Sequence, residues 1–164
     1  MPFVVVTAQF LLAAVFAVSA VAKVRDGSAF RRFVTALALP VRLSTVGVVT
    51  AELVVAGLLI VPATAPAGFA VALVLLAVFS AALGIGLRRD IPLSCGCFGS
   101  SSTPAGRAEL VRNGVLAVVA VAGLAGSAVA APLPFDSGFV ATGALGLAAA
   151  IVIVRFDDLR KGLR

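Results

Sequence analysis

Two cysteines separated by one residue form the segment best suited to chemistry, Cys95-Gly96-Cys97-Phe98-Gly99, and they are the only cysteines of the chain. Cα atoms two residues apart lie about 5–7 Å from each other, which overlaps the range of a disulfide. The small ring would be strained and easily reduced, and it would restrain too little chain to stabilise a fold. We therefore predict a reversible dithiol, with flexible backbone at Gly96 and Gly99 and with Phe98 seating the loop among lipid headgroups.

Other interpretations of the cysteine pair stay open. Two inert cysteines are disfavoured, because free cysteine is usually retained for its reactivity. The chain has no histidine, so a four-ligand zinc site would need a second subunit, whereas Cu(I) tolerates two thiolates. A static disulfide is disfavoured in a reducing compartment. We expect no resident metal and no cofactor.

The composition indicates a membrane protein, because 62% of the 164 residues are hydrophobic and 12% are charged. A spanning helix needs about 20 apolar residues, and backbone groups in lipid must be paired within the segment. The chain is therefore predicted to be all-α: a polytopic membrane helix bundle with a four-helix core and a shorter fifth transmembrane helix, forming one integral membrane domain over residues 1–164. The apolar stretches cover residues 3–22, 43–61, 67–87, 110–131 and 138–154.

The basic residues predict the orientation of these spans. With five spans, every Lys and Arg falls on or next to one side, in residues 23–42, residues 88–112 and the tail after residue 154. The positive-inside rule then places the N-terminus outside, and it places the C-terminus and the cysteine loop, residues 90–106, in the cytoplasm of a multi-pass cell-membrane protein. The chain lacks a run of basic residues interleaved with aromatic residues, the pattern typical of nucleic-acid binding. We therefore assign its net charge of +6 to contact with the lipid bilayer.

The first connection is predicted to contain a helix on the membrane surface, at about residues 28–39. Ser28 is the predicted N-cap, and Pro40 ends the run. The apolar residues of one face are Phe30, Phe33, Val34 and Leu37. A mere surface linker is the alternative.

Glu52 lies midway along the second apolar stretch. A carboxylate there costs at least a few kcal/mol and by default marks a functional site that faces the bundle interior. Its candidate partners are Arg112, Asn113 and Lys23. Two interpretations stay open: a buried polar tie between helices, or a proton relay beside the dithiol. Ordinary interhelical hydrogen bonds are expected from two further residues, Gln9 and Ser80.

Several sequence elements also occur in a recognisable order. They are Ala22-Lys23-Val24-Arg25-Asp26, Phe30, Glu52-Leu53, Cys95-Gly96-Cys97-Phe98-Gly99 and Arg112-Asn113. Over about residues 5–130 the chain resembles the MauE family of methylamine-utilisation membrane proteins, within the wider DoxX-like group. The resemblance implies a four-helix membrane core that helps to mature or export the disulfide-rich small subunit of methylamine dehydrogenase.

The resemblance also implies roles for individual residues. Cys95 and Cys97 would be the redox pair, and Glu52, Arg112 and Asn113 the supporting polar set. The partner would be a thioredoxin-like protein, met through a mixed disulfide. The family's work lies on the outer face of the membrane, whereas the charge distribution here predicts a cytoplasmic cysteine loop.

The function predicted from the sequence is that of a membrane thiol–disulfide redox helper, a candidate thiol–disulfide oxidoreductase. Two other classes of function stay open. One is a non-catalytic membrane scaffold or chaperone subunit whose loop docks a partner. The other is a Cu(I)-handling membrane protein.

Overall fold

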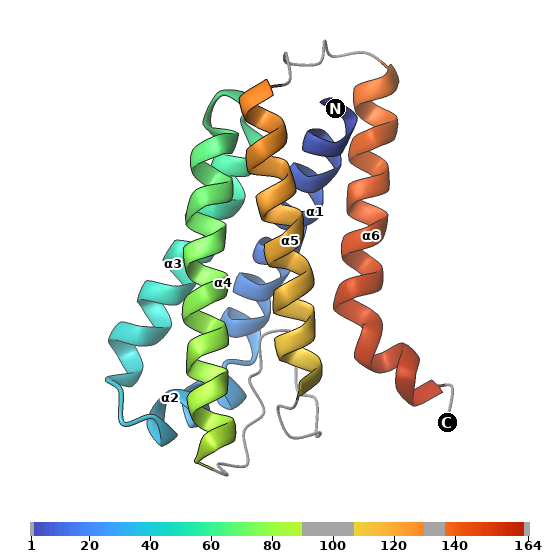
Figure 1. Ribbon diagram of the computed structural model, residues 1–164. Coiled ribbons are helices and arrows are strands. Elements are labelled where there is room, and N and C mark those ends of the chain that lie inside the picture. Colours follow the sequence, from blue (N-terminus) through green and yellow to red (C-terminus); the bar gives the residue numbers. More distant parts are fainter. Residues whose placement is uncertain (1, 90–106, 130–136, 163–164) are drawn as a thin grey trace.

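The computed structural model describes residues 2–89, 107–129 and 137–162, and the regular secondary structure in these ranges is helical (Figure 1). The prediction of an all-α fold is confirmed. The helices are α1 (Pro2–Arg25), α2 (Ser28–Ala36), α3 (Val41–Ile60), the 3₁₀ turn η1 (Pro62–Thr64), α4 (Ala65–Arg88), α5 (Arg107–Val129) and α6 (Ser137–Gly162).

Four helices are long and apolar enough to cross a membrane, and α1 is the central one. The most apolar window of α1 is 61% buried inside the bundle, against 22% for each of the other three. Helices α3, α5 and α6 all pack against α1, and α4 packs against α3 and α5. The apolar part of α6, Val140–Val154, is shorter than the four spans, which agrees with the shorter fifth helix predicted from the sequence. Helix α6 packs against α1.

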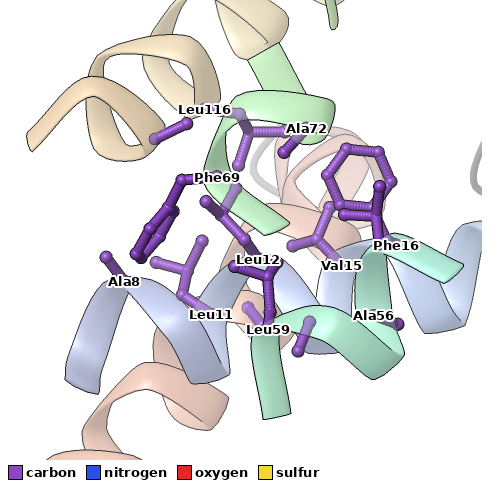
Figure 2. Close-up of a cluster of buried hydrophobic side chains, with 14 of the residues drawn as sticks. Ala8, Leu11, Leu12, Val15, Phe16, Ala56, Leu59, Phe69, Ala72 and Leu116 are labelled. Carbon is purple, nitrogen blue, oxygen red and sulfur yellow. The ribbon is translucent and has the colours of Figure 1, made fainter. Parts of the chain in front are cut away.

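The core of the bundle is a cluster of apolar side chains from α1, α3, α4, α5 and α6 (Figure 2). Leu12, Leu59 and Phe69 are fully buried there. A Cβ atom at Gly123 of α5 would overlap the ring of Phe69. The absence of a side chain at Gly123 therefore lets α5 approach α4 closely, as small residues do in membrane bundles.

Both helices that flank residues 90–106 meet the same end of the bundle, where α4 ends and α5 begins (Figure 1). The same end holds α2, the last turn of α1 and the first turn of α3. We call it the basic end. Its exposed basic residues are Arg25, Arg31, Arg32, Arg42, Arg88 and Arg89.

The first connection contains the helix α2, while its predicted place on the membrane surface stays a prediction. Its apolar face is buried (Ala29, Phe30, Phe33 and Val34), and it packs against Leu83 of α4. The face turned away carries Arg31 and Arg32, both exposed. The helix thus lies across the basic end with its apolar side against protein.

Helix α2 begins and ends differently from the prediction. Ser28 is the first helical residue, and Gly27 is the N-cap without a side-chain hydrogen bond. The residue before it, Asp26, accepts the Ser28 backbone N–H at its Oδ1 atom, at 3.3 Å. Hydrogen bonds from the Ser28 side chain and backbone, with Arg31 and Arg32 nearby, lower the pKa of Asp26 below its ordinary value. Gly27 cannot be replaced easily, because a Cβ there would lie 2.5 Å from the carbonyl oxygen of Lys23.

The C-terminus of α2 comes at Ala36, before the predicted residue 39, because the backbone turns into the left-handed region. Ala38 has a φ of 57°. Its N–H bonds to the carbonyl of Thr35, and the N–H of Leu39 bonds to that of Val34. This pair of bonds is a Schellman motif, in which glycine usually occupies the left-handed position.

Replacing Ala38 with glycine is therefore expected to stabilise the protein. A left-handed conformation costs an L-residue with a Cβ roughly 1–2 kcal/mol, and the greater flexibility of unfolded glycine offsets part of the gain. We expect Ala38→Gly to raise the free energy of unfolding by about 1 kcal/mol, measured by denaturant unfolding in detergent micelles. Ala36→Gly, at the last helical residue of α2, is the matched control and should lower the free energy of unfolding.

Candidate functional site

A lysine–glutamate ion pair lies inside the bundle. Lys23, in the last turn of α1, donates to Oε1 of Glu52, in the middle of α3, at 2.7 Å. Both side chains are 0% exposed. A buried charge is tolerated only when it is paired. The charge of each side chain therefore compensates for the burial of the other.

Ser19 completes a triangle of hydrogen bonds with this pair. Its hydroxyl donates to Glu52 Oε1 at 2.8 Å and accepts from Lys23 Nζ at 2.7 Å. Ser19 and Lys23 are four residues apart on α1, the spacing that places two side chains on one helix face. The sequence analysis missed Ser19, although this spacing would have pointed to it once Lys23 was chosen as the partner of Glu52.

Two aromatic rings also face the Lys23 ammonium group. The Nζ atom lies 5.4 Å from the centroid of the Phe30 ring of α2 and 5.6 Å from that of the Phe79 ring of α4. Ring faces attract cations, and more strongly where water is excluded. Lys23 thus contacts groups from α1, α2, α3 and α4, and it links the surface helix to three spanning helices.

The carboxylate of Glu52 is bonded unevenly. Oε1 accepts from both Lys23 and Ser19, whereas Oε2 is buried and has no hydrogen-bond partner among the described residues. An unsatisfied buried acceptor costs about 1–3 kcal/mol, and more when it is charged. The site therefore has one oxygen that holds the helices together and one that can accept a further proton or donor.

Of the three candidate partners for Glu52, the structure pairs it with Lys23. The reason is helix packing: α3 packs against α1, α2 and α4, whereas α5, which carries Arg112 and Asn113, packs against α1 and α4. Asn113 is buried and donates to Ser80 Oγ of α4 at 3.5 Å.

The two ordinary interhelical hydrogen bonders behave as predicted. Gln9 of α1 donates from Nε2 to the carbonyl of Leu59 in α3 at 3.3 Å, and Ser80 accepts from Asn113 across the contact between α4 and α5. Both bonds connect neighbouring helices and leave the Lys23–Glu52 pair untouched.

The cysteine segment (Cys95, Gly96, Cys97, Phe98 and Gly99) lies outside the described residues, so its predicted pairing stays a prediction. The described residues place its two flanking helices at the basic end, with Arg88 and Arg89 exposed there. Within those ranges, no group of three or more His, Cys, Asp or Glu side chains could hold a metal ion.

Long apolar helices packed around a buried ion pair define a multi-pass membrane helix-bundle protein. The family model described as methylamine utilisation protein MauE matches residues 1–126, and the chain belongs to this family. It is also 34% identical over 177 aligned positions to methylamine utilization protein MauE of Paracoccus denitrificans, an alignment that covers 99% of the chain and 89% of the relative. No solved structure matches the chain significantly. The family resemblance is thus confirmed, while the wider DoxX-like grouping stays a prediction.

Proposed function

We propose that this protein is a membrane thiol–disulfide exchange helper in methylamine utilisation. Membership of the MauE family and the name of the Paracoccus denitrificans relative support the pathway. The chemistry rests on Cys95 and Cys97, which lie within the matched residues and are the only cysteines of the chain. The protein maturing through this exchange would be disulfide-rich, as is the small subunit of methylamine dehydrogenase.

The exchange needs only one dithiol and one disulfide. The thiolate of one cysteine attacks a disulfide of a thioredoxin-like partner, which breaks the partner's S–S bond and forms a mixed disulfide. The second cysteine then displaces the partner, so that Cys95 and Cys97 lose two electrons and the partner gains two. The same two steps in the opposite order carry two electrons from the partner back to Cys95 and Cys97.

The observation that carries this proposal is the charge at the basic end. Exposed Arg88 and Arg89 close α4, and Arg107 begins α5, on either side of the cysteine loop. Nearby cations lower the pKa of a thiol and favour the attacking thiolate. By the positive-inside rule this end faces the cytoplasm, so electrons would come from a cytoplasmic thiol donor. Labelling of intact cells with a membrane-impermeant thiol reagent tests that orientation.

A trapping experiment tests the exchange itself. Cys97→Ser removes the resolving thiol if Cys95 attacks first, and the mixed disulfide with the partner should then accumulate on a non-reducing gel. Cys95→Ser is the matched variant for the opposite order. The double Cys→Ser variant should trap nothing and should lose maturation of the client protein.

Two outcomes would contradict the proposal. Normal client maturation in the double variant would indicate a non-catalytic scaffold or chaperone subunit. Stoichiometric Cu(I) in the purified protein, absent from the double variant, would indicate copper handling by the thiolates.

A further inference from the structure

The carboxylate of Glu52 has a free acceptor in the centre of the bundle. Lys23 and Ser19 both bond to Oε1, and Oε2 is sealed from solvent without a partner among the described residues. A proton arriving at Oε2 would break neither bond, because Oε1 would accept both hydrogen bonds as a carbonyl oxygen. One carboxylate oxygen, Oε1, therefore makes the interhelical hydrogen bonds, and the other, Oε2, is available to bind a proton.

We propose that Glu52 is a proton-binding site of this membrane bundle and that Oε2 is the atom that takes the proton. In the step, a hydronium ion of the aqueous phase gives up one proton, so that one of its O–H bonds breaks, water is released and an O–H bond forms at Oε2, while both hydrogen bonds to Oε1 remain. The Lys23–Glu52 pair changes from a net charge of zero to +1. The ligand is a proton and the site is a buried carboxyl group, whatever reaction the cysteines perform.

The surroundings of Lys23 allow this change of charge. When Glu52 is neutral, the ammonium group keeps its hydrogen bond to Ser19 and its position facing the rings of Phe30 and Phe79, at 5.4 and 5.6 Å. Two ring faces stabilise a desolvated cation. The ammonium group of Lys23 therefore keeps these contacts when the neighbouring carboxyl group is uncharged.

Among the residues that the structure describes, few other charges face this site. From α1, Lys23 is the charged group that faces Glu52, and α2 and α4 contribute the two rings. Helix α5 carries Glu109 and Arg112 but packs against α1 and α4 instead of α3. Proton binding at Glu52 is therefore expected to depend mainly on Lys23 and Ser19.

The composition allows this proposal to be tested without altering Glu52. Glu52 and Glu109 are the only glutamates of the chain, so glutamate labelled with ¹³C at Cδ in the Glu109→Gln variant reports a single carboxyl group. We expect its resonance, in protein reconstituted in lipid, to shift to the position of a carboxylic acid within the pH range in which the protein stays folded. Glu109→Asp serves the same purpose if Glu109→Gln fails to fold.

The controls separate this site from the thiol chemistry. Adding Glu52→Gln must remove the labelled carboxyl resonance, which assigns it to Glu52. The Cys95→Ser and Cys97→Ser double variant should keep the shift, so proton binding can stand even where the thiol proposal fails. A resonance that stays at the carboxylate position over this whole pH range would overturn the proposal. It would mean that Oε2 accepts a hydrogen bond from water and does not bind a proton.

Discussion

Replacing Glu52 with leucine is expected to lower the free energy of unfolding by about 3–5 kcal/mol, the cost of leaving one partner of a buried ion pair without the other. The Lys23 ammonium group is 0% exposed, so water cannot replace the lost carboxylate. Denaturant unfolding of the protein in detergent, followed by circular dichroism, measures the loss.

A double-mutant cycle provides the control. Lys23→Met combined with Glu52→Leu removes both charges and keeps similar volumes, so it should recover most of the lost stability. Lys23→Met alone should also lower the free energy of unfolding, because it leaves the buried Glu52 carboxyl group without its partner. Strictly additive effects of the two single substitutions would show that the pair contributes no coupling energy.

Replacing Gly146 with valine is expected to displace α6 from α1. A Cβ atom at this position would lie 2.6 Å from the carbonyl oxygen of Thr7 and 3.1 Å from the backbone N of Leu11. Both atoms belong to the backbone of α1, so they cannot turn aside as a flexible side chain can. Overpacking of this kind typically costs about 1–3 kcal/mol, and here it weakens the contact between α6 and α1.

Limited proteolysis and denaturant unfolding both measure this effect. The Gly146→Val protein should be cleaved faster on α6 and should unfold at lower denaturant. Gly57→Val is the matched control: it makes the same change inside a helix, but nothing lies within 4 Å of its Cβ position. Equal losses in the two variants would mean that helix propensity, and not the α1–α6 contact, causes the destabilisation.

The helices could be predicted from the sequence because the pattern that requires each helix lies within its own residues. An apolar stretch of spanning length in lipid must be helical, and the alternation of Phe30, Phe33 and Val34 with Arg31 and Arg32 requires an amphipathic helix. The partner of Glu52 was narrowed to three residues, but the choice among them depends on which helix packs against α3, and apolar periodicity does not encode packing order.

The residues that the sequence analysis missed share one cause. Phe79 is one of many apolar residues on α4, and its position facing Lys23 depends on how α4 is rotated. The N-cap is predicted at Ser28 from residue type alone, whereas the N-cap in the structure is Gly27, which lies too close to the Lys23 carbonyl for a Cβ atom. In each case a contact with a distant or crowded group decided the outcome.

The ion pair also has a consequence for biosynthesis. Lys23 and Glu52 lie 29 residues apart, and a ribosome makes Lys23 first. During translation the first helix therefore reaches the insertion machinery with a lone cation near one end, and its counter-ion is still unmade. The first two spanning helices are accordingly expected to leave the translocon together as a pre-formed hairpin, and a variant without Glu52 should insert more slowly and accumulate at lower yield.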